Sequence, residues 1–174
     1  MFKIRKCEVQ DVPAVGGFYD RIVYDLVHHI NYPQWMYKVY PSVGSVKEDV
    51  ATGNQFACYD GDRICGAFVI NSDPKGSYGK ARWKRQLKQG QYLVIHSLAA
   101  DDKQLHQGIG SAMVRYCIDY AKRHGFQAIR LDVVPDNTPA RRLYEKFGFC
   151  YAGDVDLERG ITTIPSFSMY ELNL

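Results

Sequence analysis

The most informative part of the sequence has the pattern of a buried strand followed closely by a glycine-bearing helix start. It reads Tyr92-Leu-Val-Ile-His-Ser-Leu-Ala-Ala100, then Asp101 to His106, then Gln107-Gly-Ile-Gly-Ser111. The nearly continuous apolar run predicts a buried strand. A helix that begins just after such a strand presents unpaired backbone N–H groups and the positive end of its dipole, and both favour phosphate. Gly108 and Gly110 leave room for a pyrophosphate, and close helix packing is their alternative role.

The common phosphate-binding fingerprints are absent. No G-x-x-x-x-G-K-[ST] occurs, and G-x-G-x-x-G would need glycine at the position of Met113. The glycine pair alone therefore does not identify the ligand.

Strands and helices alternate around this stretch, with a hairpin turn predicted at Asp60-Gly61-Asp62. Strands are predicted at residues 3–7, 55–59, 63–71, 92–99, 128–134, 150–152 and 166–172, and helices at 11–29, from a Ser45 cap to Ala51, at 107–124 and at 137–147. This order predicts an α/β fold with a mixed sheet and helices on its faces. Without an internal repeat or a linker, residues 1–174 are expected to form a single domain.

Composition narrows the class of protein. Of 174 residues, 46% are apolar and 24% are charged, which excludes a disordered chain. No apolar run approaches the roughly 18 residues that cross a bilayer, and the N-terminus lacks the apolar stretch of a secretory signal. We expect a soluble, unexported, cytoplasmic protein. The net charge of +3 is too small to argue for nucleic acid.

The positive charge is concentrated between residues 74 and 91. This segment holds six basic and no acidic residues, namely Lys75, Lys80, Arg82, Lys84, Arg85 and Lys88. A solvated, mobile flap is the favoured interpretation, and attraction of an anionic ligand is the alternative.

The five cysteines are scattered and form no C-x-x-C pair, which fits a reducing cytoplasm and gives no zinc site. Cys58 and Cys65 are expected to come close across the hairpin as buried thiols. His28 and His29 lack further ligands at metal-binding spacing, so no metal is predicted.

A second block, Asn137-Thr-Pro-Ala-Arg-Arg-Leu-Tyr-Glu-Lys-Phe-Gly-Phe149, follows the predicted strand at 128–134. With Leu98-Ala-Ala100 and Gly108-Ile-Gly110 it resembles the GCN5-related N-acetyltransferase (GNAT) family. That family's signatures are Arg/Gln-x-x-Gly-x-Gly/Ala at a helix start and a later Asn-x-x-Ala-x-x-x-Tyr-x-x-x-Gly-Phe. The resemblance implies a mixed sheet splayed between the strands at 92–99 and 128–134, with acetyl-CoA as acetyl donor.

The resemblance also implies the residues that hold acetyl-CoA. The backbone of Leu98, Ala99 and Ala100 would pair with the pantetheine arm, and Asn137 would contact it. Arg141 or Lys146 would reach the nucleotide phosphates. The pyrophosphate would be held by the amides of Gln107, Gly108, Ile109, Gly110 and Ser111.

One residue departs from the family pattern. Leu105 stands where the family usually has Arg or Gln, so one side-chain contact to phosphate is missing. Such a charge-assisted bond contributes roughly 1.5 to 3 kcal/mol unless a neighbour, here His106 or Gln107, replaces it.

Three residues are candidates for the chemistry. By resemblance, Tyr144 would protonate the departing thiolate, although its place on an apolar helical stripe also fits a core tyrosine. His96 is the titratable imidazole of the strand at 92–99 and suits a general base, with a structural histidine as the alternative. Asp132, on the strand at 128–134, is the competing base or a structural hydrogen-bond acceptor, and water is a further candidate.

Two functions follow. The first is direct transfer of the acetyl group of acetyl-CoA to a primary amine of a small molecule, amino acid or peptide, and the second is a non-catalytic acyl-CoA-binding module of the same fold. The acceptor pocket is expected from the first helix and the segments 31–40 and 74–91, with Tyr32, Trp35, Tyr37 and Trp83 as walls. The expected partners are acetyl-CoA and an amine, without nucleic acid or membrane, and homodimer assembly stays open.

Overall fold

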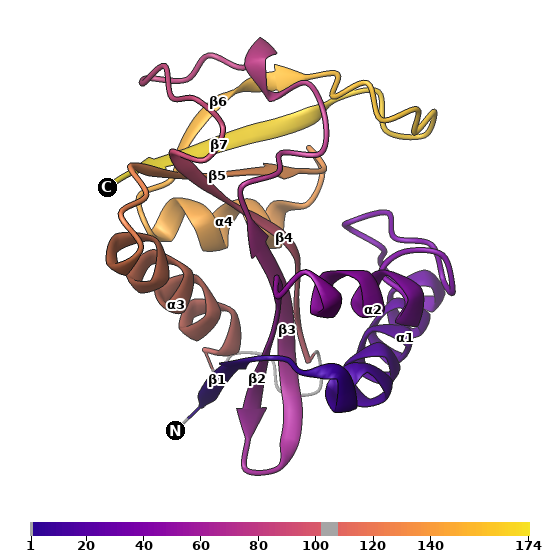
Figure 1. Ribbon diagram of the computed structural model, residues 1–174. Coiled ribbons are helices and arrows are strands. Elements are labelled where there is room, and N and C mark those ends of the chain that lie inside the picture. Colours follow the sequence, from indigo (N-terminus) through magenta and orange to yellow (C-terminus); the bar gives the residue numbers. More distant parts are fainter. Residues whose placement is uncertain (1, 102–107) are drawn as a thin grey trace. The chain divides into compact units, whose positions relative to one another are not determined.

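The computed structural model describes residues 2–101 and 108–174 (Figure 1). The chain forms two compact units, one of residues 1–70 and 96–116 and the other of residues 71–95 and 117–174. Strand β4 (Tyr92–Ala100) and helix α3 (Ile109–Arg123) each contribute residues to both units.

The first unit pairs three antiparallel strands and two helices. The strands are β1 (Lys3–Lys6), β2 (Gln55–Asp60) and β3 (Arg63–Asn71), and the helices are α1 (Val12–His28), preceded by a 3₁₀ turn at Val9–Asp11, and α2 (Val43–Ala51). Figure 1 shows α1 and α2 side by side. The 3.6-residue period of α1 places Val15, Phe18, Tyr19 and Ile22 in the core.

The start of α2 corrects one prediction. Ser42, rather than Ser45, is the N-cap, and its hydroxyl accepts the Ser45 amide at 3.4 Å. Ser45 is the third helical residue, and its hydroxyl accepts the Ser42 amide at 3.0 Å. This reciprocal pairing is a capping box, in which both serines satisfy amides, so either residue taken alone fits a cap.

The second unit contains a parallel strand pair and the antiparallel pairs of the C-terminal strands. The first residues of β4 pair in parallel with β5 (Ala128–Val133), which pairs antiparallel with β7 (Phe167–Asn173), and β7 pairs antiparallel with β6 (Cys150–Val155). Helix α4 (Thr138–Lys146) lies between β5 and β6 in the sequence. The strands follow one another through hydrogen bonds in the order β1-β2-β3-β4-β5-β7-β6, which confirms the predicted mixed α/β sheet.

The register of β5 shows where the parallel pairing ends. Three residue pairs join β4 to β5, from Tyr92 with Ala128 to Val94 with Arg130, whereas β7 pairs with all six residues of β5. Parallel pairing with β5 therefore involves the first three residues of β4. Whether residues 1–174 act as one domain stays a prediction.

The basic segment 74–91 is not the solvated flap that its charge suggested. Tyr78, Ala81 and Trp83 are buried in the core of the second unit, and Tyr78–Lys80 forms a 3₁₀ turn. The Arg82 amide donates to the Ala152 carbonyl at 2.9 Å, which fixes the segment beside β6. Apolar side chains interleaved with the basic ones anchor the backbone, while most of the charged side chains stay exposed.

The cysteines behave as predicted across the hairpin. Cys58 and Cys65 are fully buried free thiols whose Sγ atoms lie 3.7 Å apart. Burial raises the pKa of Cys58 to about 12.

Among the helices of the described chain, none combines the length and the apolar character needed to cross a bilayer.

Candidate active site

Helix α3 begins at Ile109, directly after Gly108, at the place where the sequence predicts an anion-binding helix start. Gly108 has φ +81°, in the left-handed region, and its carbonyl accepts the Ala112 amide at 2.9 Å. Ile109, Gly110 and Ser111 therefore carry the first amides of the helix, a position where backbone N–H groups have no partner within the helix itself. Gln107 lies outside the described residues, as do Leu105 and His106.

The need for glycine at position 108 is a matter of backbone rather than packing. A Cβ added to Gly108 would meet no atom of the described residues within 4 Å, so close helix packing does not explain it. Its positive φ does, because L side chains rarely adopt that conformation.

The end of β4 carries the residues expected to pair with the cofactor arm. Leu98 and Ala100 are partly exposed, whereas Ala99 is 5% exposed and joins the core of the first unit. Ser97 stands just before them with φ +50°.

Asp101 fixes the end of β4 and was not singled out from the sequence. Its side chain is fully buried and pairs with Arg21 of α1, at 3.3 Å, and with Arg63 of β3. Its amide donates to the Cys65 carbonyl at 2.8 Å. Consecutive aspartates after a buried strand are a visible signal, but the two arginine partners stand 80 and 38 residues away in the sequence.

His96 lies on β4 and is 9% exposed. The four residues before it, Tyr92 to Ile95, are buried as well, so the imidazole belongs to a largely water-free part of the strand. Among the described residues, no group of three or more His, Cys, Asp or Glu side chains is arranged to hold a metal ion.

Asp132 on β5 is fully engaged by two partners. Its carboxylate receives two hydrogen bonds from the Arg159 guanidinium, at 2.7 and 2.8 Å, and one from the Tyr78 hydroxyl at 2.6 Å. Burial and the adjacent Asp132 charge raise the pKa of Tyr78 well above its usual value. To take a proton from an amine, Asp132 would have to give up this ion pair, so the geometry favours its structural role.

Tyr144 on α4 is 6% exposed and packs edge-on against Phe149, with ring centroids 5.4 Å apart. Burial, followed by the influence of Cys117 and Asp132, raises the pKa of Tyr144 well above its usual value. The phenol therefore keeps its proton throughout the neutral range. Within residues 2–101 and 108–174, no group hydrogen bonds to its hydroxyl.

The two polar residues predicted to contact the cofactor have partners inside their own unit. Asn137 caps α4, since its side-chain oxygen accepts the Ala140 amide at 3.2 Å. Arg141 donates to the Tyr170 hydroxyl at 2.9 Å and to the Pro135 carbonyl at 3.1 Å. Among the described residues, the Asn137 side-chain nitrogen and Nη2 of Arg141 make no hydrogen bond.

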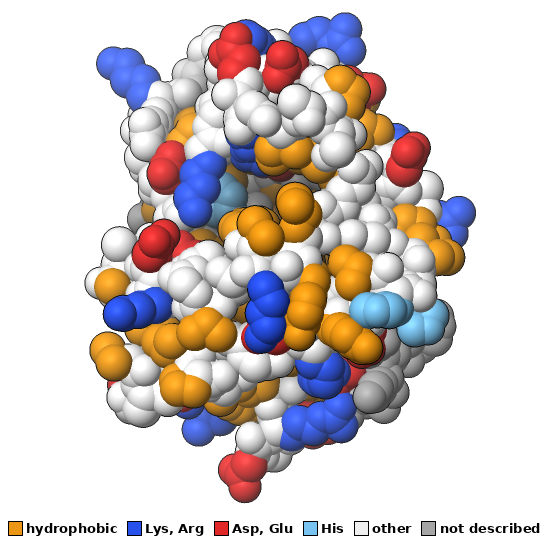
Figure 2. Space-filling view, turned by 90° about the vertical axis from the view of Figure 1, so that its right-hand side faces the viewer, with side chains coloured by type: hydrophobic (Ala, Val, Ile, Leu, Met, Phe, Trp, Pro, Cys, Tyr) orange, Lys and Arg blue, Asp and Glu red, His pale blue; other side chains and the backbone are white. Residues whose placement is uncertain are grey.

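The expected acceptor residues divide into surface and core. Figure 2 faces α1 and α2 and shows hydrophobic side chains gathered over these helices. Tyr37 is 41% exposed there, whereas Trp35 packs against Tyr19 with ring centroids 6.3 Å apart, and Tyr32 is partly buried. Trp83 is not a pocket wall: it lies in the core of the second unit, 4.3 Å from the Arg130 guanidinium. The exposed apolar side chains of the α1–α2 region are Tyr24, Val27, Ile30, Met36, Tyr37, Val39, Tyr40 and Val43.

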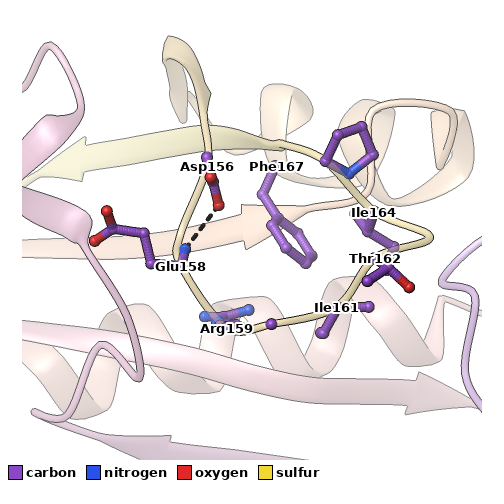
Figure 3. A pocket seen from close by; sticks show the side chains of 9 residues that line it. Asp156, Glu158, Arg159, Ile161, Thr162, Ile164 and Phe167 are labelled. Atoms are coloured by element: carbon purple, nitrogen blue, oxygen red, sulfur yellow. Dashed lines mark hydrogen bonds between the residues drawn. The ribbon is translucent and has the colours of Figure 1, made fainter.

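A separate cavity of about 440 Å³ lies within the loop between β6 and β7 (Figure 3). Its wall includes Arg159 and Phe167, and the Glu158 amide donates to the Asp156 carboxylate at 2.8 Å. None of the site residues expected from the sequence lines it. Of the site residues expected from the sequence, only Asp132 hydrogen-bonds to a described residue of the cavity wall, which is Arg159.

Comparison with solved structures identifies the fold. A GNAT acetyltransferase from Streptococcus agalactiae 2603 aligns with a TM-score of 0.79 at 14% identity, covering 99% of this chain and 95% of that one. The protein yncA from Salmonella typhimurium, solved with its cofactor acetyl-CoA, aligns with a TM-score of 0.70 at 15% identity, covering 99% and 94%. The fold is therefore that of GNAT acetyltransferases.

Sequence comparison supplies the family. An uncharacterized N-acetyltransferase of Methanocaldococcus jannaschii is 29% identical over 91 residues, which are 52% of this chain and 39% of that protein. This chain spans 31% of a second curated relative. The pattern of the acetyltransferase (GNAT) family matches residues 23–149. Since that match covers more than half of the chain, the chain belongs to the GNAT family of N-acetyltransferases, which uses acetyl-CoA as its acetyl donor.

Proposed function

We propose that the chain transfers the acetyl group of acetyl-CoA directly to a primary amine of a small molecule, amino acid or peptide. A bond forms between the amine nitrogen and the acetyl carbon, and the bond from that carbon to sulfur breaks. The amine gives up one proton, and the departing thiolate takes one. The observation that carries the proposal is the left-handed Gly108 at the start of α3, where an added Cβ would meet no atom of the described residues within 4 Å.

The amides at this helix start would hold the pyrophosphate of acetyl-CoA. Gly108, Ile109, Gly110 and Ser111 contribute N–H groups, with Gln107 as a further candidate, and the positive end of the helix dipole favours the same anion. The backbone of Leu98–Ala100 would pair with the pantetheine arm.

Gly108→Glu tests this assignment. Its carboxylate would fill the phosphate approach and add like charge, so we expect CoA affinity to fall by about 100-fold or more, the equivalent of losing one or two charge-assisted bonds. Gly125→Glu is the matched control, because Gly125 follows the other end of α3 with φ +73° and equally open space. Isothermal titration with CoA measures the affinity of both folded variants. Equal affinities would remove the pyrophosphate from this helix start.

Tyr144 and His96 are the proposed acid and base. The buried Tyr144 phenol keeps its proton and would donate it, or a hydrogen bond, to the thiolate. His96 would take the amine proton directly or through water, because imidazole titrates near neutrality. Asp132 is the weaker choice, since Arg159 and Tyr78 occupy its oxygens.

The base assignment is tested by the pH dependence of kcat/KM with one acceptor amine. We expect a limb that rises through neutral pH in the wild type and is lost in His96→Gln, while acetyl-CoA affinity stays unchanged. Asp132→Asn should keep the limb and lower the melting temperature, since it weakens the interactions of Arg159 and Tyr78. The opposite pattern, with the limb lost only in Asp132→Asn, would make Asp132 the base.

A non-catalytic acyl-CoA-binding module is the second candidate. Leu105 in place of the usual Arg or Gln, and a β4 strand without a carboxylate, favour it. Thiol release from acetyl-CoA, measured across free amines, amino acids and N-terminal peptides, separates the two functions. Amine-dependent release supports the enzyme, whereas tight CoA binding without such release supports the module.

A further inference from the structure

Ser97 interrupts β4 with a backbone conformation that L-residues rarely adopt. Its φ of +50° lies in the left-handed region, although the strand continues on both sides. Such a residue persists where surrounding contacts over-determine it, and such positions gather at functional sites. Its chain neighbours are His96 and Leu98, to which the proposed function gives proton transfer and a contact with acetyl-CoA. The contacts that hold Ser97 therefore bear on both.

Two tyrosine hydroxyls from outside β4 hold Ser97. Tyr19 of α1 is 1% exposed, and its hydroxyl donates to the Ser97 carbonyl oxygen at 2.8 Å. The hydroxyls of Tyr40 and Ser97 form a hydrogen bond with each other. One tyrosine thus fixes the backbone of the left-handed residue, and the other fixes its side chain.

Tyr40 reaches Ser97 from a tight surface turn. The Tyr40 amide donates to the Met36 carbonyl at 3.0 Å, and the Met36 amide donates to the Tyr40 carbonyl at 3.2 Å. Tyr40 is 39% exposed, in contrast to Tyr19, whose ring belongs to the core of the first unit. Removing the Tyr40 hydroxyl therefore perturbs Ser97 without opening the core.

We infer that Tyr40 is a positioning residue whose hydroxyl holds Ser97 in the left-handed conformation and so sets the backbone of Leu98–Ala100 for acetyl-CoA. The inference rests on the proposed function for where acetyl-CoA binds. Without the hydroxyl, Ser97 gains access to extended conformations, and these turn the following amides and carbonyls away from the arrangement that the cofactor arm needs.

Tyr40→Phe tests the inference by calorimetric titration with acetyl-CoA. We expect the Kd to rise about five- to tenfold, the loss that one neutral hydrogen bond represents. Tyr151→Phe is the matched control: Tyr151 is an exposed tyrosine of β6 whose ring packs against Tyr170, and it has no part in the proposed site. Its Kd should equal that of the wild type. Ser97→Ala removes the other hydroxyl and should match Tyr40→Phe, with no further rise in the double variant.

Ser97→Gly separates positioning from direct contact. Glycine adopts a positive φ at no steric cost, so in this background Tyr40→Phe should change the Kd by less than about twofold. A rise in Kd on Tyr40→Phe that persists in the Ser97→Gly background would mean that Tyr40 contacts acetyl-CoA itself. An unchanged Kd in Tyr40→Phe alone would mean that the Tyr40 hydroxyl does not position the backbone of β4. Either result overturns the inference. Failure of the wild type to bind acetyl-CoA in the same titration would instead overturn the proposed function.

Discussion

Tyr144→Phe removes one oxygen atom from the proposed acid and leaves its ring in place. The ring is buried against Phe149, and no described group hydrogen bonds to the hydroxyl, so the substitution orphans no known partner. We therefore expect the free energy of unfolding to change by no more than about 0.5 kcal/mol. If the hydroxyl protonates the thiolate, kcat should fall by about 10²- to 10⁴-fold, equivalent to about 3 to 5.5 kcal/mol of transition-state stabilisation.

The assay follows thiol release from acetyl-CoA at saturating amine, with the KM for acetyl-CoA measured in parallel. The KM should change little, because the hydroxyl acts mainly on the departing thiolate. Since burial raises the pKa of Tyr144, the loss in kcat should be similar from pH 7 to pH 9. Tyr92→Phe, which removes the hydroxyl of another buried tyrosine in the same unit, should keep full activity. A fully active and stable Tyr144→Phe variant would return Tyr144 to the core and refute the acid assignment.

Three further predictions concern stability and thiol reactivity. Burial raises the pKa values of Tyr19 and Tyr78 above those of tyrosine in the unfolded chain, which ionises near ~10. Their stabilising contribution is therefore complete below that pH and is lost as the pH rises above it. Guanidinium unfolding between pH 8 and 11 should show this decline in the free energy of unfolding, and a flat profile would contradict it. Gly16→Ala should lower the free energy of unfolding by about 1 to 3 kcal/mol, because its Cβ would lie 2.5 Å from a side chain of α2. Gly17→Ala should raise the free energy of unfolding by about 0.5 to 1 kcal/mol, because its Cβ would meet no described atom within 4 Å. Equal shifts of the two variants in chemical denaturation would refute the packing argument. Cys150 is the exposed thiol of the five, so Ellman's reagent should label one thiol in the native protein and five after unfolding, and rapid native labelling in Cys150→Ser would be inconsistent with this burial.

The sequence predicts helices and strands well where the hydrophobic periodicity agrees with the turn and capping residues. Every strand and α-helix of the described chain falls within a few residues of its predicted place, because buried apolar residues recur with the period of the element that buries them, whereas the two short 3₁₀ helices were not predicted. The Asp60-Gly61-Asp62 turn sets the hairpin in the same way. The Ser45 cap was wrong because two serines three residues apart form one capping box, and spacing alone does not say which comes first.

Charged partners are where sequence reasoning reaches its limit. Asp132 looks like a candidate base on its strand, but Tyr78 stands 54 residues before it and Arg159 stands 27 residues after it. Basic residues 74–91 look solvated because their charge dominates the composition, while Tyr78, Ala81 and Trp83 decide their packing. Contacts at such separations depend on the closed fold, so local patterns carry no signal for them.

Ser97 shows how local preference and function separate within one strand. Residues 92–99 predict an uninterrupted strand, and nothing in the run marks serine as the residue with a positive φ, since glycine is the usual choice there. The conformation is upheld by Tyr19 and Tyr40, which lie 78 and 57 residues away in the sequence. Places where a structure breaks a local rule and compensates through distant contacts are expected at functional sites. Here the exception falls between His96, which the sequence marks as the titratable imidazole of the strand, and Leu98, which the family resemblance assigns to the cofactor arm. Backbone geometry and sequence reasoning therefore single out the same few residues of β4.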